Sequence, residues 1–213
     1  MLAPSLCLRG HTFHRLGPQP VVIDLGANDG KFAAELLEQH PDATVVLVEG
    51  DPFLVRRLRE RFATQRNVLL YAGLIGAQAR ERATFHLSRI AEGNSVHLAL
   101  AASWSPQETR AIEMPMIDLG GLFSLARLNQ VELLKVDIEG SEYDVLPSIG
   151  PELARSIAQL SVEFHDFAEP AWRKKTEACI EHLERLGYAH RARGTAVRQG
   201  SPYFDCHFWR AAG

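Results

Sequence analysis

The sequence has few cysteines, no long apolar run and no strong charge of either sign. Its three cysteines, Cys7, Cys179 and Cys206, lie far apart in 213 residues, which is the pattern of neither a disulfide framework nor a zinc site. No apolar run approaches the ~20 residues needed to cross a bilayer. The net charge is −3 with both signs interspersed, so no basic surface for nucleic acid is indicated. We expect a cytoplasmic protein without nucleic-acid or membrane partners.

The first nineteen residues also lack the apolar core of a signal peptide. Four polar residues fall where that core would lie: Arg9, His11, His14 and Arg15. We interpret 1–19 as an extension or short helix that could act as a lid, with a loosely ordered tail as the alternative. Residues 20–213 show no repeat, low-complexity tract or linker, so they are predicted to form one domain. A homodimer is compatible with this sequence, which does not define the oligomeric state.

Strands and helices alternate along the chain. Apolar runs predict buried strands at 21–25, 44–48, 67–72, 131–136 and 159–164. Amphipathic segments predict helices after Gly30, after Asp51-Pro52 and over 171–186. Alternating patterns predict two strands, at 83–87 and 112–116, around an irregular insert (91–106), and two more within 187–210. This order implies right-handed βαβ crossovers and a mostly parallel sheet covered by helices on both faces, with an antiparallel member from the final hairpin.

The most informative segment is 21–30, which reads VVIDLGANDG. It predicts a buried strand that ends in a tight turn before a helix N-terminus, a place where ligands bind. Its Gly-x-x-x-Gly spacing lacks the middle glycine that makes room for a pyrophosphate in dinucleotide sites. A cofactor with an amino acid and a nucleoside but no phosphates fits better, and this points to S-adenosylmethionine. The expected contacts are Asp24, Gly26, Ala27, Asn28 and Gly30; a helix-capping turn without a ligand is the alternative.

Two other segments are candidates for the same cofactor. Glu49 ends the second predicted strand, 25 residues after Asp24, where an acidic residue accepts hydrogen bonds from ribose hydroxyls. A solvated glutamate is the alternative. The insert 91–106 is a candidate acceptor-binding or lid segment, because long irregular connections in compact domains are usually functional or disordered. Its Asn94 and Ser95 are expected near the adenine end, although an ordinary excursion between strands needs no such role.

A second constellation follows the strand at 131–136. Asp137, Glu139 and Glu142 fall within six residues. Crowded carboxylates raise one another's pKa, which is costly unless a metal, a cation or a role in proton transfer compensates. We predict that Asp137 and Glu139 serve catalysis. The alternatives are that Glu139 forms a salt bridge with Lys135 and that Glu142 only begins a helix.

Four blocks together resemble the FkbM family of methyltransferases: 24–30, Glu49 with Pro52, 135–142 and 163–165. The resemblance covers 21–165 and implies an S-adenosylmethionine-dependent enzyme of class I, with a Rossmann-like αβα sandwich of three layers. It also implies a seven-stranded sheet whose last strand is antiparallel, and methylation of hydroxyl oxygens on sugars or natural products. The sequence departs from the family pattern at Gly50, 117–119 and Pro147, which affects the acceptor pocket rather than the cofactor contacts. Pro147 predicts a short helix after Glu142.

Methyl transfer to an alcohol requires that the hydroxyl lose its proton during attack or be acidified by a metal. Asp137, Glu139 and His165 follow neighbouring strands and are expected to converge, with His165 as general base; a structural histidine is the alternative. A divalent ion held by Asp137, Glu163 and His165 is compatible with the sequence, which does not establish it. We therefore expect an O-methyltransferase for a small-molecule or carbohydrate acceptor. A nucleotide-dependent oxidoreductase and a non-catalytic cofactor-binding module remain the alternatives.

Overall fold

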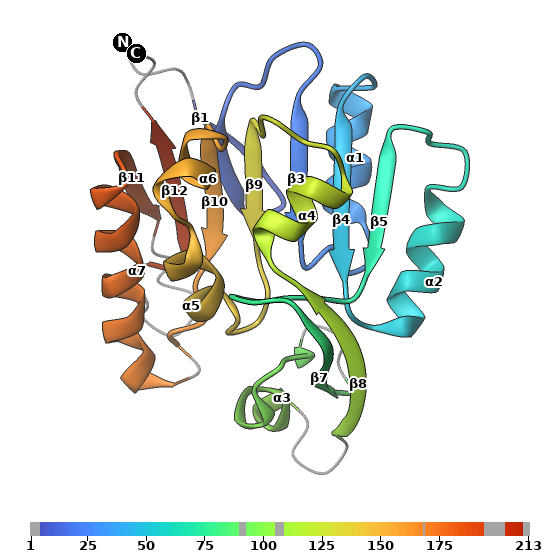
Figure 1. The fold of residues 1–213 in the computed structure, drawn as a ribbon, viewed down its shortest axis with the longest axis vertical. Coiled ribbons are helices and arrows are strands. Elements are labelled where there is room, and N and C mark those ends of the chain that lie inside the picture. Colours follow the sequence, from blue (N-terminus) through green and yellow to red (C-terminus); the bar gives the residue numbers. More distant parts are fainter. Residues whose placement is uncertain (1–4, 90–92, 105–108, 168, 194–202, 211–213) are drawn as a thin grey trace.

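The computed structural model describes residues 5–89, 93–104, 109–167, 169–193 and 203–210. Its centre is a seven-stranded sheet with the strand order β11-β12-β10-β9-β3-β4-β5 (Figure 1). The strands are β3 Val21–Leu25, β4 Thr44–Glu49, β5 Val68–Ala72, β9 Leu133–Val136, β10 Gln159–Glu163, β11 Tyr188–Arg193 and β12 Asp205–Arg210. Strand β12 pairs antiparallel with both of its neighbours, and the other pairings are parallel. The predicted mostly parallel sheet with an antiparallel C-terminal strand is confirmed.

The described helices are α1 Lys31–Gln39, α2 Pro52–Arg61, α3 Leu98–Trp104, α4 Leu119–Leu125, α5 Glu142–Val145, α6 Pro151–Arg155 and α7 Arg173–Arg185, with 3₁₀ turns at Leu146–Ser148 and Pro170–Trp172. Helix α2 begins as its sequence predicts, since the Asp51 side chain accepts from the Phe53 N–H and Pro52 occupies the first turn. Helix α5 is as short as Pro147 predicts. The longest of these helices has 13 residues, and none within the described part of the chain could span a membrane.

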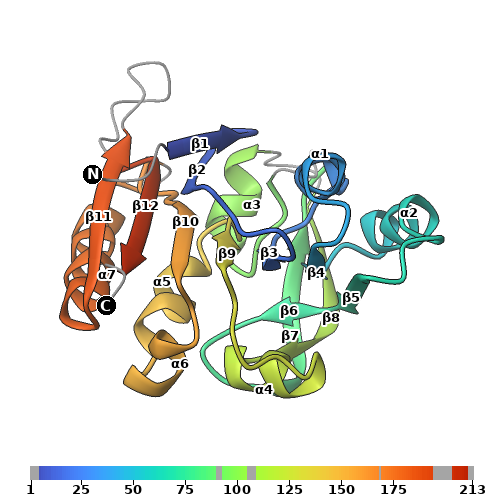
Figure 2. The same ribbon diagram turned by 90° about the horizontal axis from the view of Figure 1, so that it is seen from above.

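Helices cover the sheet on both faces (Figure 2). Each face buries its own apolar core. Alternate residues of β3 point in opposite directions, so Ile23 packs in the core shared with α4, α5 and α7, whereas Val22 packs in the core shared with α1 and α2. Both side chains are fully buried. This two-sided burial explains why the strands read as continuous apolar runs.

The N-terminal segment forms a β-hairpin, β1 Ser5–Leu8 and β2 His11–His14, rather than the expected helix or loose tail. Arg9 and Gly10 make its turn with positive φ angles of 50° and 92°. Phe13 is buried in the core with α1. Thr12 Oγ1 donates to Asp205 Oδ2 over 2.6 Å, and the Gly17 N–H donates to Glu132 Oε1 over 2.6 Å. Long-range contacts therefore hold this hairpin on the sheet.

The carboxyl ends of the parallel strands lie at one edge of the sheet, and a smaller sheet covers that edge together with α3 (Figure 1). This second sheet contains β6 Leu74–Ile75, β7 Arg80–Leu87 and β8 Arg110–Ile117. The chain moves outward from β3 to β4 and β5 and then returns to β9 beside β3, which makes a topological switch point between β3 and β9. The insert expected to be irregular contains α3, while its residues 91–92 and 105–106, like the turn predicted at 200–202, lie outside the described residues.

Candidate active site

The turn after β3 is tied to the end of β4 by its backbone. The N–H groups of Gly26 and Ala27 both donate to the carbonyl of Val48 over 3.1 Å, and the Asn28 N–H donates to Glu49 Oε2 over 2.8 Å. Three successive amides are therefore used within the protein instead of forming the row of donors that binds a pyrophosphate. The geometry agrees with the absence of the dinucleotide fingerprint.

Gly26 is required by the backbone itself. Its φ is +78°, and an added Cβ would overlap the carbonyl oxygen of Asp137. The nearest obstacle is thus the turn that follows β9. This close approach brings two of the sequence motifs, 24–30 and 135–142, into direct contact.

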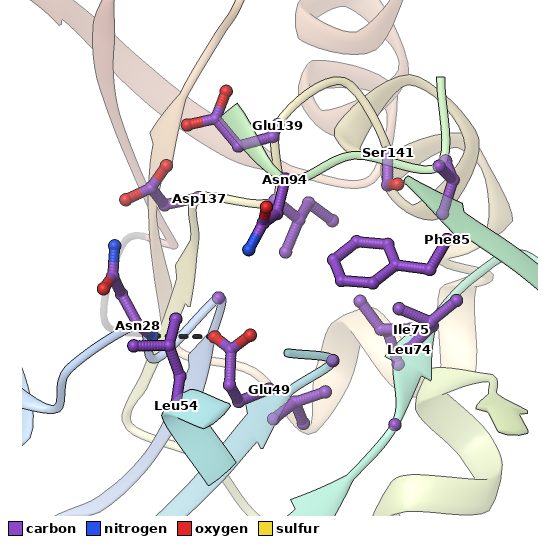
Figure 3. Close-up of a pocket in the computed structure, with 16 residues that line it drawn as sticks. Asn28, Glu49, Leu54, Leu74, Ile75, Phe85, Asn94, Asp137, Glu139 and Ser141 are labelled. Atoms are coloured by element: carbon purple, nitrogen blue, oxygen red, sulfur yellow. Dashed lines mark hydrogen bonds between the residues drawn. The ribbon is translucent and has the colours of Figure 1, made fainter. Parts of the chain in front are cut away.

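Glu49 is 7% exposed and lies in the wall of a cavity at the switch point (Figure 3). Its Oε1 accepts from the Asp51 N–H over 2.8 Å, and its Oε2 accepts from Asn28. Burial raises the pKa of Glu49 to about 7, because it outweighs the hydrogen bonds from Asp51 and Asn28 that favour the ionised form. The carboxylate is held in place from two sides.

The cavity encloses about 610 Å³ of space including its open mouth. Figure 3 shows Glu49 facing Asp137 and Glu139 across it, with Phe85, Leu74 and Ile75 forming an apolar wall. Gly50 belongs to the same wall, and a Cβ there would lie 2.6 Å from Leu74 Cδ2 and 3.1 Å from Phe85. Glycine at position 50, one of the departures from the family pattern, therefore leaves room for the side chains of Leu74 and Phe85.

Asp24 does not line the cavity. Its fully buried carboxylate lies beneath the turn, where Oδ1 is 2.8 Å from Lys135 Nζ, and the same ammonium donates to the carbonyl of Gly26 over 3.1 Å. Burial raises the pKa of Asp24, and Lys135 opposes this shift. Lys135 pairs with Asp24. The salt bridge between Lys135 and Glu139 that the sequence left open is not formed among the described residues. The ion pair of Asp24 and Lys135 supports the turn from below.

His165 is the centre of the carboxylate cluster and is only 1% exposed. Its Nδ1 lies 3.0 Å from Glu142 Oε1, and its Nε2 lies 3.3 Å from Glu139 Oε2. Asp137 and Glu163 are farther from Nε2, at 3.8 and 3.9 Å. Burial alone would lower the pKa of His165, but Glu139 and Glu142 outweigh it and raise the pKa well above its ordinary value. These surroundings favour the protonated imidazole, whereas the expected role as general base requires the neutral ring.

The neighbouring carboxylates respond differently to their surroundings. Burial raises the pKa of Glu139, and burial together with the charge of Asp137 raises the pKa of Glu163 to about 8. The pKa of Asp137 falls below its ordinary value, since Lys135, His11 and His165 together outweigh the effect of burial. Glu139 has an unusual backbone for a residue other than glycine, with φ +49°. This turn conformation aims its side chain at His165.

Asn94 and Ser95 fasten the insert to the two turns of the site. Asn94 Nδ2 donates to Asp51 Oδ2 over 2.9 Å, and Asn94 lines the cavity. Ser95 Oγ is fully buried and donates to the carbonyl of Glu139 over 2.6 Å. The structure thus brings Asn94 to the predicted site but gives Ser95 a supporting position behind it.

His11 is the site residue that sequence reasoning missed. The hairpin places its imidazole, 4% exposed, with Nε2 3.7 Å from Asp137 Oδ2. A polar hollow beside the main cavity is lined by His11, Lys135 and Asp137. The strand that carries this histidine, His11–His14, alternates between buried and partly exposed residues. Four residues are too few for such a pattern to be recognised in the sequence.

Comparison with known proteins agrees with this geometry. The sequence model of the methyltransferase FkbM domain matches residues 24–189. The chain is 25% identical to the AMB antimetabolite synthetase AmbE of Pseudomonas aeruginosa over 224 aligned positions, which cover 90% of this chain and 10% of AmbE. It is 26% identical to the 2-O-methyltransferase NoeI of Sinorhizobium fredii over 160 positions, which cover 70% of this chain and 65% of NoeI. The chain spans less than two thirds of either relative.

Solved structures show the same fold at low sequence identity. A methyltransferase FkbM from Methylobacillus flagellatus matches with a TM-score of 0.60 at 14% identity, covering 92% of this chain and 44% of that one. The fibrillarin pre-rRNA processing protein of Methanococcus jannaschii matches with a TM-score of 0.51 at 12% identity, covering 93% and 71%. The fold is that of class I methyltransferases. Since the family match spans more than half of the sequence and contains both turns of the site, the chain belongs to the methyltransferase FkbM domain family.

Proposed function

We propose that this chain transfers a methyl group from S-adenosylmethionine to a hydroxyl oxygen of a small-molecule or carbohydrate acceptor. The observation that carries the proposal is a single cavity with Glu49 on one side and Asp137 and Glu139 on the other (Figure 3). One side suits a nucleoside and the other suits proton transfer. Membership in a methyltransferase family and the name of the relative NoeI, a 2-O-methyltransferase, support this assignment.

The residues present fit the cofactor. Each oxygen of Glu49 already accepts one backbone N–H, and a carboxylate has about four acceptor positions, so two remain for ribose hydroxyls. Leu54, Leu74 and Phe85 offer apolar surface for the adenine ring. Asn28 lies beside Asp137 at the acidic side, where the cationic part of the cofactor is stabilised. When bound, the cofactor supplies an electrophilic methyl group.

The other predicted contacts take indirect roles in this proposal. Ala27 and Gly30 shape the turn, with the Gly30 N–H donating to the carbonyl of Ala27 over 2.9 Å. Asp24 acts through Lys135 on the carbonyl of Gly26. Direct contact is left to Gly26, Asn28, Glu49 and Asn94, which line the cavity.

We assign to Glu139 the role of general base, which takes the proton from the acceptor hydroxyl. It lines the cavity, whereas the buried ring of His165 is enclosed by Glu139 and Glu142. A protonated His165 cannot accept another proton, but it can orient Glu139 through their 3.3 Å contact. Asp137, on the same side, positions the acceptor hydroxyl. This division keeps the three predicted catalytic residues and changes the role of the histidine.

A screen with labelled S-adenosylmethionine tests the proposal. The panel contains sugars, glycosylated lipids, hydroxylated amino acids and amines, and Glu139→Gln is compared with Glu113→Gln, an exposed carboxylate on β8 that matches the change in charge. We expect label on a hydroxyl and a loss of turnover of about 10²–10⁴-fold in Glu139→Gln only, with affinity for S-adenosylhomocysteine nearly unchanged. Label on amines alone would refute O-methylation, and binding without turnover on any acceptor would favour a non-catalytic module.

A further inference from the structure

Three ligand-type side chains from separate elements converge beside the proposed acceptor site. His11 comes from β2, Asp137 from the turn after β9, and Glu163 from the end of β10. One ligand atom of each lies within 4.8 Å of those of the other two. Donor atoms about 2.1 Å from a common ion are separated by roughly 3–4 Å, so small side-chain movements suffice. We propose that His11, Asp137 and Glu163 bind a divalent metal cation.

His11 fits this role better than His165, which the sequence suggested. Both ring nitrogens of His165 already face carboxylates outside this ligand set, Glu142 at 3.0 Å and Glu139 at 3.3 Å. The His11 side chain is 5% exposed, and its Nδ1 has no hydrogen-bond partner among the described residues. Its Nε2 faces Asp137 at 3.7 Å, beyond hydrogen-bond length. His11, rather than His165, is therefore the histidine able to ligate a metal ion.

The hairpin holds His11 in position without a metal. The ring packs edge-on against Phe32, with centroids 5.7 Å apart. Thr12, the next residue, is anchored to Asp205, and Gly17 is anchored to Glu132. A ligand fixed by the surrounding fold loses little freedom on binding. The hairpin thus contributes a pre-positioned donor from outside the segment that matches the family, which begins at residue 24.

Lys135 competes with a metal for Asp137, with Nζ 3.5 Å from Oδ2. It lies closer to Asp24, at 2.8 Å, and donates to the carbonyl of Gly26. Asp24 supplies the counter-charge of Lys135, so Asp137 can be shared with a metal. One imidazole and two carboxylates form a mixed nitrogen and oxygen set, which suits Mn²⁺, Fe²⁺ or Zn²⁺ better than the all-oxygen preference of Ca²⁺.

The test is Mn²⁺ binding to the chelator-treated protein, measured by loss of the electron paramagnetic resonance signal of free Mn²⁺. We expect one ion per chain and a loss of affinity of at least about tenfold in His11→Phe, which keeps a ring against Phe32. His14→Phe is the matched control, because His14 lies on the same strand but packs against His207 and Trp209. Asp137→Asn provides a second loss of ligand, and melting curves of all variants verify folding.

Absence of Mn²⁺ binding to the wild-type protein at millimolar concentration would overturn the proposal. So would a folded His11→Phe protein that binds Mn²⁺ with wild-type affinity. Loss of binding in Glu139→Gln with none in His11→Phe would place the ion among Asp137, Glu139 and His165 instead and refute this ligand set. Titration of the metal-free protein with S-adenosylhomocysteine is scored separately, so failure of the metal site and failure of the proposed function are distinguishable.

Discussion

The structure predicts that cofactor binding depends on pH, because the buried carboxylate of Glu49 must be ionised to bind the ribose. The carboxylate must be ionised to accept both ribose hydroxyls, yet burial raises its pKa to about 7 in the free protein. Protonation then competes with binding. For a pKa near 7, the competent fraction is about 9% at pH 6 and about 91% at pH 8, so affinity should rise about tenfold over this interval. The sign is fixed, because binding favours the ionised form and strengthens as pH increases.

The assay is calorimetric titration with S-adenosylhomocysteine at pH 6, 7 and 8. The amino group of the ligand also titrates, so Glu49→Gln provides the reference: it carries no ionisable group but retains the size of the side chain. We expect the variant to bind more weakly by about 1.5–3 kcal/mol, since its amide oxygen still accepts from one hydroxyl and the lost hydrogen bond to a charged group contributes about that much. The tenfold rise should be seen only in the wild-type protein relative to this reference. Equal pH profiles in the two proteins, or equal affinities, would refute the placement of the ribose at Glu49.

Three further changes test the parts that hold the site. Gly26→Ala should lower the melting temperature and abolish binding of S-adenosylhomocysteine, because its Cβ overlaps the Asp137 carbonyl; Gly10→Ala, also at positive φ but with open space around it, should keep binding. Ser95→Ala should cost about 1–3 kcal/mol in urea unfolding and reduce turnover more than cofactor affinity, and unchanged turnover would contradict its support of the Glu139 turn. Lys135→Met should destabilise the protein by about 3–5 kcal/mol by leaving Asp24 buried alone, and adding Asp24→Asn should recover part of that loss; no recovery would contradict the ion-pair explanation.

Local patterns were sufficient to predict the sheet and the turns at its edge. Strand β3 has the predicted bounds, 21–25, because a run of apolar residues buried on both faces is a strong local signal. The cap at Asp51 and the short α5 also follow from neighbouring residues alone. The hairpin at 5–14 could not be predicted in this way, since its anchors, Asp205 and Glu132, lie more than a hundred residues away.

The roles of individual site residues depend on tertiary contacts, which the spacing of motifs in the sequence does not reveal. The sequence placed Asp24 and Lys135 near the turns, but only the parallel register of β3 and β9, which aligns Asp24 with Lys135, shows that they neutralise each other. The role of His165 depends in the same way on tertiary contacts. A histidine between two carboxylates keeps a proton that an isolated one would release near neutral pH.

The N-terminal hairpin extends the folded domain beyond the segment that matches the family. The family match starts at residue 24, yet His11 and Phe13 are buried against residues inside that match, and Glu132 and Gln159 accept backbone N–H groups from Gly17 and His14. If residues 5–19 were only a tail, their loss would expose little apolar surface. Here it would uncover Phe32 and remove the donors that Glu132 and the buried Gln159 now accept from. We therefore infer that the N-terminal residues fold with the domain, and that one wall of its polar hollow is built from a segment that the family match does not include.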